Sequence, residues 1–237
     1  MKVLFSHLIV LLSISVISCY DKKISNDKEN ENEWLKEFYV NPDELATVGT
    51  NEYFILKPGY QLILKGTEDE KDVLLIITVL DETKIVDGME TRIVEERESK
   101  GGELIEVSRN YFAINKNNKD VFYFGEEVDI YKNDKIVSHE GEWESGKKSA
   151  KFGLMIPGKI IIGKKYYQEI APGVAMDRAE IVSDSIVFET PTGRFENCLK
   201  TEETTPLEQG EKEYKIYAPG IGLVKDGSLV LTEYKNR

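Results

Sequence analysis

The amino-acid sequence predicts an all-β protein with a predominantly antiparallel sheet that is strongly curved, either barrel-like or two-layered. Runs rich in β-branched and aromatic residues recur from Asn51 to the end of the chain, and tight-turn pairs such as Pro58-Gly59 separate them. Helical spacing of apolar residues is nearly absent, so we expect at most one short helix near the N-terminus. A sheet of about ten or more strands must curl or fold over itself.

The first elements of the globular part follow from local patterns. Trp34 and Phe38 lie four residues apart, which predicts the short helix, and Pro42 limits its length. Residues 52–66 predict two strands around Pro58-Gly59, because proline fixes φ and glycine accepts a positive φ. Residues 72–86 are apolar on both alternations, which indicates a central strand.

Hairpin turns organise most of the remaining chain. Residues 89–115 predict a hairpin around Gly101-Gly102, and residues 120–143 predict one that turns at Asn133-Asp134. Residues 145–165 contain four glycines, and we interpret them as a long ordered loop between two groups of strands. Strands follow to the end of the chain, the last two joined at Asp226-Gly227.

The N-terminal residues predict export. A positive start, Met1-Lys2, precedes the apolar run Val3–Ile17, which as a helix would be roughly 22 Å long, too short to cross a hydrocarbon core of about 30 Å. This pattern is typical of a secretory signal peptide, here residues 1–18. The residues "VISC" at its end resemble the lipobox of bacterial lipoproteins. The resemblance implies cleavage before Cys19 and acylation of that cysteine.

The residues after Cys19 predict a tether between a membrane and a folded body. Residues 20–33 contain a single aliphatic residue, Ile24, and cannot bury enough apolar surface to offset the entropy of ordering. We therefore expect a flexible segment over residues 19–33, one all-β domain over residues 34–237, and a lipid bilayer as partner through acylated Cys19. By resemblance to lipoprotein sorting in enteric bacteria, Tyr20 in place of aspartate favours the outer membrane, with the domain facing the periplasm.

The charge of the chain excludes some classes of partner. The formal net charge of −12 predicts repulsion of nucleic acid and of anionic lipid. Acidic runs such as "EERESKGGE" and "EEVD" are spread along the chain, and we interpret them as a solubilising surface. With Cys19 acylated, only Cys198 remains, so no intramolecular disulfide is expected. We interpret Cys198 as a buried, inert thiol.

The richest group of polar candidates surrounds a predicted turn at Pro172-Gly173. The weakly indicated binding residues are Glu169, Asp177, Arg178, Glu180 and Trp143. Pairing around the turn would place Glu169 beside Asp177, and two such carboxyls can act as general acid and base in glycan hydrolysis or bind a hard cation. The simpler interpretation, which we favour, is a cross-strand network in which Arg178 neutralises nearby acids. No recognised catalytic or metal-binding motif is present, so no catalytic residue, metal site or cofactor is predicted.

Several segments resemble a family of bacterial envelope lipoproteins and secreted proteins that carries no established activity. The matching residues include "YFILKPG", "FYFGEE", "EGEWESG", "MIPG", "GKKYYQEIAPGVAMDRAEI" and "YAPGIGLVK". The resemblance implies export and a mainly β fold. The predicted function is a lipid-anchored envelope lipoprotein, with a non-catalytic binding or structural role. A carrier of an apolar ligand or lipid, a periplasmic glycan hydrolase and a module that binds an envelope protein are the alternatives.

Overall fold

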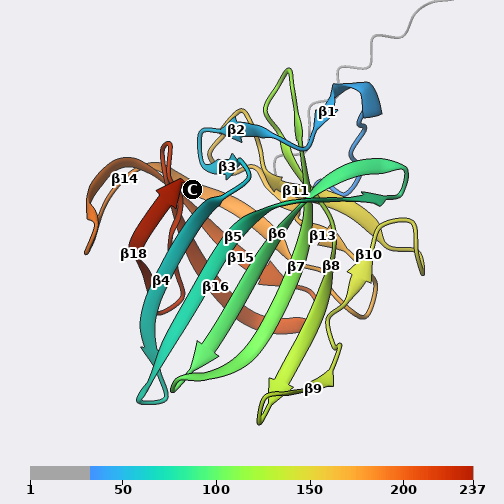
Figure 1. Cartoon of the computed structure of the whole chain (residues 1–237). Helices are drawn as coiled ribbons and strands as arrows, with labels where there is room; N and C mark the ends of the chain where they lie inside the picture. The colour runs from blue at the N-terminus through green and yellow to red at the C-terminus, as the bar shows by residue number, and fades with distance from the viewer. Residues whose placement is uncertain (1–32, 237) are drawn as a thin grey trace, which may run out of the picture.

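Antiparallel strands that run side by side around a common interior dominate the computed structural model, which describes residues 33–236 (Figure 1). The predicted signal peptide, Cys19 and nearly all of the predicted tether lie outside the described residues. The strands are β1 (Leu45–Ala46), β2 (Gly49–Asn51), β3 (Phe54–Leu56), β4 (Tyr60–Glu68), β5 (Lys71–Val86), β6 (Met89–Lys100), β7 (Glu103–Asn115), β8 (Val121–Lys132), β9 (Lys135–Ser138), β10 (Trp143–Glu144), β11 (Lys151–Ile156), β12 (Lys165–Tyr167), β13 (Glu169–Ile170), β14 (Arg178–Thr190), β15 (Gly193–Thr205), β16 (Glu208–Ala218), β17 (Gly222–Asp226) and β18 (Leu229–Asn236).

Sixteen of these strands form one sheet that is almost closed into a barrel. The order along the sheet is β12-β14-β15-β16-β17-β18-β4-β5-β6-β7-β8-β11-β13, and β1, β9 and β10 pair at its margins. The two ends of this order are consecutive in sequence, because β12 pairs with β14 while β13 pairs with β11. The segment 165–170 therefore bridges both ends. At this closure the β11 backbone passes so close that a Cβ on Gly153 would lie 2.3 Å from the Gln168 carbonyl oxygen, which requires glycine.

The all-β prediction and most of the turn predictions are confirmed. Residues 71–86 form the interior strand β5 between β4 and β6. The hairpin β6–β7 turns at Gly101-Gly102. The hairpin β17–β18 is also present, but its two turn residues are Gly227 and Ser228, because Asp226 still pairs with Leu229. Asn133 and Asp134 join β8 to β9 with φ of 51° and 59°, the left-handed conformation that such a two-residue turn requires.

Two local predictions are wrong. Residues 34–38 are extended rather than helical, because the Leu35 backbone joins the edge of β12: its N–H donates to the Lys165 carbonyl at 3.0 Å. The only helical turn in the described chain is a 3₁₀ turn, Pro42–Glu44. Residues 151–156, expected within a loop, form strand β11. The predicted turn at Pro58-Gly59 is confirmed: it lies between strands β3 and β4, which pair with other strands rather than with each other.

A strap across one end of the barrel closes that end. It comprises β1 to β3, which lie at the upper end in Figure 1. The Asn51 amide nitrogen donates to the Lys119 and Pro157 carbonyls, at 2.9 and 3.1 Å. The Tyr53 hydroxyl donates to the Asn197 carbonyl at 3.0 Å. These bonds join the strap to segments far away in sequence, so the strap is part of the folded body.

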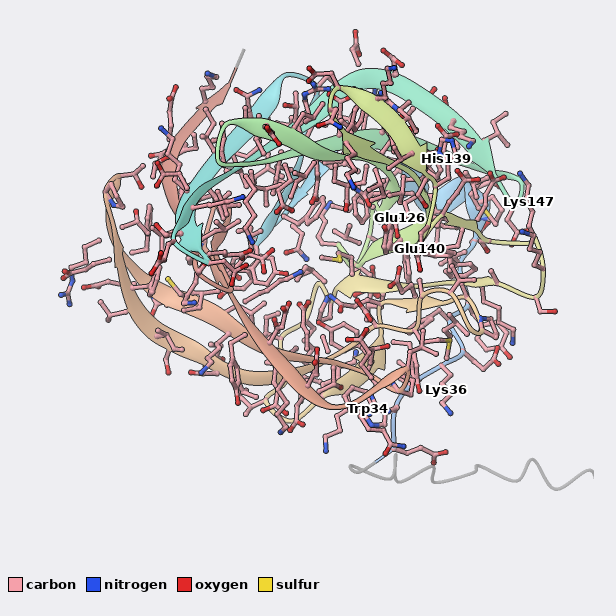
Figure 2. All side chains as sticks on the ribbon, turned by 90° about the horizontal axis from the view of Figure 1, so that it is seen from below. Trp34, Lys36, Glu126, His139, Glu140 and Lys147 are labelled. Atoms are coloured by element: carbon pink, nitrogen blue, oxygen red, sulfur yellow. The ribbon has the colours of Figure 1, made fainter. Side chains whose placement is uncertain are left out.

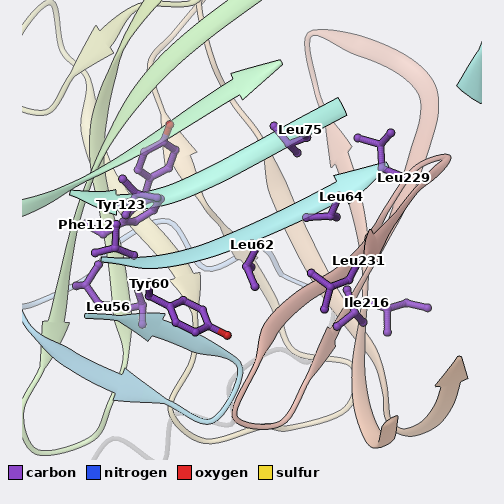
Figure 3. Close-up of a cluster of buried hydrophobic side chains, with 14 of the residues drawn as sticks. Leu56, Tyr60, Leu62, Leu64, Leu75, Phe112, Tyr123, Ile216, Leu229 and Leu231 are labelled. Atoms are coloured by element: carbon purple, nitrogen blue, oxygen red, sulfur yellow. The ribbon is translucent and has the colours of Figure 1, made fainter. Parts of the chain in front are cut away.

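The barrel interior has an apolar wall and a polar wall. Strands β18, β4 and β5 supply the apolar wall with their inward side chains, among them Leu62, Leu64, Leu75, Leu229 and Leu231, all buried (Figure 3). Strands β6 to β8 and β15 to β17 supply the polar wall, where several inward positions carry charged side chains, among them Glu96 and Lys215. Figure 2, which looks into the barrel from below, shows Glu126 of β8 on this interior side.

Candidate binding site in the barrel interior

A cavity of about 80 Å³ lies inside the barrel, where the apolar wall, the polar wall and the strap meet. The strap contributes Tyr53 and Phe54, the apolar wall contributes Ile77, and Phe112 of β7 completes the apolar lining. Such a lining excludes water from one part of the cavity and favours an apolar group there. A second hollow, of about 240 Å³, lies between the 3₁₀ turn and the β5–β6 turn.

The opposite side of the cavity carries charges. Glu96 of β6, Lys215 of β16 and Asp226 of β17 all line it. Strand register brings these side chains to one place. Ile77 of β5 pairs with Glu96 of β6, and Lys215 of β16 pairs with Asp226 of β17, so inward side chains from four strands line the same cavity. The cavity therefore has an apolar side and a charged side, as a site for an amphipathic molecule requires.

Lys215 is already engaged by two carboxylates. Its ammonium lies 3.2 Å from a Glu203 oxygen and 3.7 Å from an Asp226 oxygen. Burial alone would lower the pKa of Lys215, but Glu203 and Asp226 together raise it well above the usual value. Lys215 is therefore charged at physiological pH. The Glu203 carboxylate also accepts hydrogen bonds from Gln168 at 3.3 Å and from Thr201 at 3.2 Å.

Glu96 has no such support. The Glu96 side chain forms no hydrogen bond or ion pair with any residue in the described part of the chain. Surrounding protein encloses the carboxyl group, although the residue as a whole is only half-buried. Burial raises the pKa of Glu96 to about 7, Lys215 opposes the rise, and Asp226 adds to it. Near neutral pH a large fraction of this carboxyl is protonated, because the charge of Lys215 offsets only part of the cost of burial.

The acidic character continues along the polar wall. Burial raises the pKa of Glu126 to about 8, and burial together with the charge of Glu126 raises the pKa of Glu169 well above its ordinary value. The pKa of Asp177 is also raised, first by burial and then by Glu203. Among residues 33–236, the carboxyls on this wall thus outnumber the interior cation that reaches them, Lys215.

Three buried polar groups have no hydrogen-bond partner among the residues that the structure describes. They are the hydroxyls of Tyr166 and Tyr217 and the indole nitrogen of Trp143. Tyr217 is only 2% exposed and lines the cavity. A buried hydroxyl without a partner costs about 1–3 kcal/mol of desolvation free energy, so such a group on a residue that lines a cavity marks a place for a ligand or an ordered water.

The structure separates the five predicted candidates into two groups. Glu169, Asp177 and Trp143 come together: the N–H groups of Gln168 and Glu169 donate to the Asp177 carbonyl at 2.8 and 3.3 Å, and the Trp143 indole opposes the rise in the pKa of Glu169. These three residues do not line the cavity. The hypothesis of a glycan hydrolase that uses Glu169 and Asp177 therefore stays a prediction.

Arg178 and Glu180 form the second group and lie with Trp34 and Lys165. The Arg178 guanidinium lies 4.3 Å from the centre of the Trp34 ring and donates to the Thr204 hydroxyl at 3.0 Å. Glu180 lies 3.4 Å from the Lys165 ammonium. The cation–π contacts of Arg178 and Lys165 with Trp34 hold the extended N-terminal segment at the edge of β12, and Arg178 forms no ion pair with a carboxyl in the described part.

Sequence reasoning missed Glu96, Glu126, Lys215, Asp226 and Tyr217. Glu96 and Glu126 belong to the runs "EERESKGGE" and "EEVD", so the interpretation of those runs as solubilising surface is wrong for both residues. The spacing of residues along β6 could have revealed Glu96. Side chains at alternate positions of a strand share one face, so Glu96 and Glu98 point to the interior as Val94 does. Cys198 is buried, as predicted.

Two absences concern the described part only. There, no group of three or more His, Cys, Asp or Glu side chains is arranged to hold a metal ion. Among residues 33–236, no helix has the length and apolar character needed to span a membrane. Comparison with known protein families, with characterised proteins and with solved structures found no match.

Proposed function

We propose that this chain is a lipid-anchored lipoprotein of the bacterial cell envelope whose β domain binds a small amphipathic molecule without catalysis. The observation that carries the binding role is the cavity, which joins an apolar lining to a charged side and to the unpartnered Tyr217 hydroxyl. Several enclosed carboxyls near the cavity have too few cations to neutralise them, which lowers the stability of the fold. A role in binding would explain why the protein contains groups that lower its stability.

The anchoring part of the proposal rests on the lipobox-like residues around Cys19 and on the polar segment that follows. Several acyl chains on one cysteine give stable membrane attachment, since each buried methylene adds about 0.8 kcal/mol. The proposed location is the outer membrane, with the domain on the periplasmic side. Palmitate labelling and a membrane-bound wild type are expected, and both should be lost in Cys19→Ala. A fully water-soluble, unlabelled wild type would contradict anchoring.

The binding role is tested with protein purified from the cells that make it. We expect native mass spectrometry, together with extraction of the denatured protein, to reveal a co-purified small molecule. Ile77→Phe places a larger side chain into the cavity and should abolish that molecule. Its neighbour Ile76 points to the opposite face of β5, so Ile76→Phe is a matched control that should retain the molecule. Repeated ligand-free spectra and extracts from wild type would remove the proposal.

A further inference from the structure

We propose that the ligand carries a positively charged amino group, which binds between the Glu96 carboxylate and the Tyr217 hydroxyl while its alkyl part enters the apolar side of the cavity. This inference rests on the proposed binding function and specifies the chemical class of the ligand. Glu96 and Tyr217 both line the cavity, on strands β6 and β16. Within the described residues the Glu96 carboxyl forms no ion pair and the Tyr217 hydroxyl forms no hydrogen bond.

The charges around the cavity select a cation. Lys215 is shared by Glu203 and Asp226, which leaves Glu96 without a counter-ion. Four acids near Glu96 add to its negative potential to the extent that they are ionised: Glu98 on the same strand, Glu106 on β7, Glu126 on β8 and Asp226 on β17. An anionic ligand is repelled by this wall. A neutral ligand leaves Glu96 unpaired, whereas an ammonium group pairs with it directly.

The Tyr217 hydroxyl and the aromatic rings around the cavity also favour an ammonium group beside Glu96. The buried Tyr217 oxygen can accept one of its N–H bonds, which removes the cost of the unpartnered hydroxyl. Tyr60 and Phe112 also line the cavity, and aromatic ring faces attract cations by roughly 0.5–2 kcal/mol. The cavity volume of about 80 Å³ is small, since a dry cavity of about 150 Å³ accommodates benzene, so a short alkyl chain fits best.

The test compares three probes with one alkyl chain: butylammonium, butanol and butanoate. Each is titrated into the whole protein at constant ionic strength, and binding is followed by the NMR shifts of the amides around Tyr217. With so few non-hydrogen atoms, affinities in the micromolar to millimolar range are expected. Butylammonium should bind about 10-fold or more tightly than butanol, which corresponds to about 1.4 kcal/mol. Butanoate should not bind.

Variants assign this preference to named groups. Glu96→Gln keeps the shape of the side chain and should remove the preference for butylammonium over butanol. Glu103→Gln removes an exposed acid on β7 and should leave the preference unchanged. Tyr217→Phe should weaken butylammonium binding several-fold. The thermal unfolding temperature of each variant verifies that the barrel is intact.

Proton release provides a second readout. Glu96 must ionise to pair with the ligand, so butylammonium affinity should rise between pH 6 and pH 8, and calorimetry in two buffers should detect released protons. The groups that face Glu96 are Lys215 of β16, Asp226 of β17, Glu106 of β7, Glu126 of β8 and Glu98 of its own strand. Of these, Lys215 stays charged over that range.

The outcomes separate the two proposals. Equal binding of butanol and butylammonium, preference for butanoate, or an unchanged preference in Glu96→Gln would overturn the amine inference and leave the binding function standing. If none of the three probes shifts a cavity amide and no molecule co-purifies with the protein, both proposals fail.

Discussion

The two walls of the barrel interior follow the same strand geometry and contain opposite chemistry. On β5 the inward side chains Leu75 and Ile77 are apolar, and on neighbouring β6 the residues that pair with them are Glu98 and Glu96. The second border lies between β17 and β18, where Asp226 pairs with Leu229. The apolar wall excludes water and stabilises the fold, whereas the polar wall retains charge that burial penalises. This difference assigns stability to the apolar wall and, in the proposed function, ligand recognition to the polar wall.

The largest expected effect is on the apolar wall. Leu64 is fully buried within it, so Leu64→Ala should lower the free energy of unfolding by about 3 kcal/mol, the sum of lost burial and a new cavity. Urea denaturation monitored by circular dichroism measures the change. A loss below about 1 kcal/mol would mean that this wall is not the main stabilising core.

On the polar wall, loss of the single shared cation should be almost as costly. Lys215→Met leaves Glu203 and Asp226 without their counter-ion, and breaking such an enclosed pair costs about 3 kcal/mol at pH 8. At pH 5 the loss should be smaller, because more of the neighbouring carboxyls are protonated there. An equal loss at both pH values would argue against an electrostatic role for Lys215.

Two adjacent acids on β8 should respond in opposite directions. Glu126 is enclosed, with its pKa raised to about 8, so Glu126→Gln should stabilise the protein by about 2 kcal/mol at pH 8 and have little effect at pH 5. Glu127 lies 2.8 Å from the Lys84 ammonium, which lowers the pKa of Glu127. Glu127→Gln should therefore destabilise by about 0.5 kcal/mol at neutral pH. Denaturation curves in which both variants change stability in the same direction would be inconsistent with Glu126 facing the barrel interior and Glu127 facing the outside.

The smallest change in stability is expected at the unpartnered hydroxyl. Tyr217→Phe removes a buried polar atom without a partner, so stability should stay within about 1 kcal/mol of wild type or rise slightly. A clear destabilisation in urea would show that the hydroxyl has a structural partner, such as an ordered water. The ligand titrations described above report its role in binding separately.

The sequence predicted the fold better than the site, for a physical reason. Turn residues act locally, so Gly101-Gly102 and Asn133-Asp134 could be assigned from neighbouring residues alone. The face of a strand that points inward depends on register. In "VEERES" charged residues occupy consecutive positions, and only pairing with β5 places Glu96 inside and Glu95 outside. The extended segment around Leu35 likewise depends on a distant strand edge.

The dependence of stability on pH tests the under-neutralised polar wall most directly. A carboxyl whose pKa is raised by folding holds its proton in the native state and releases it near pH 4.5 when unfolded, so stability falls as pH rises from that value toward the folded pKa. Wild-type protein in 0.5 M salt, which screens surface charges, should lose at least about 2 kcal/mol of unfolding free energy between pH 5 and pH 8. A free energy that stays constant or rises over this range would contradict the account.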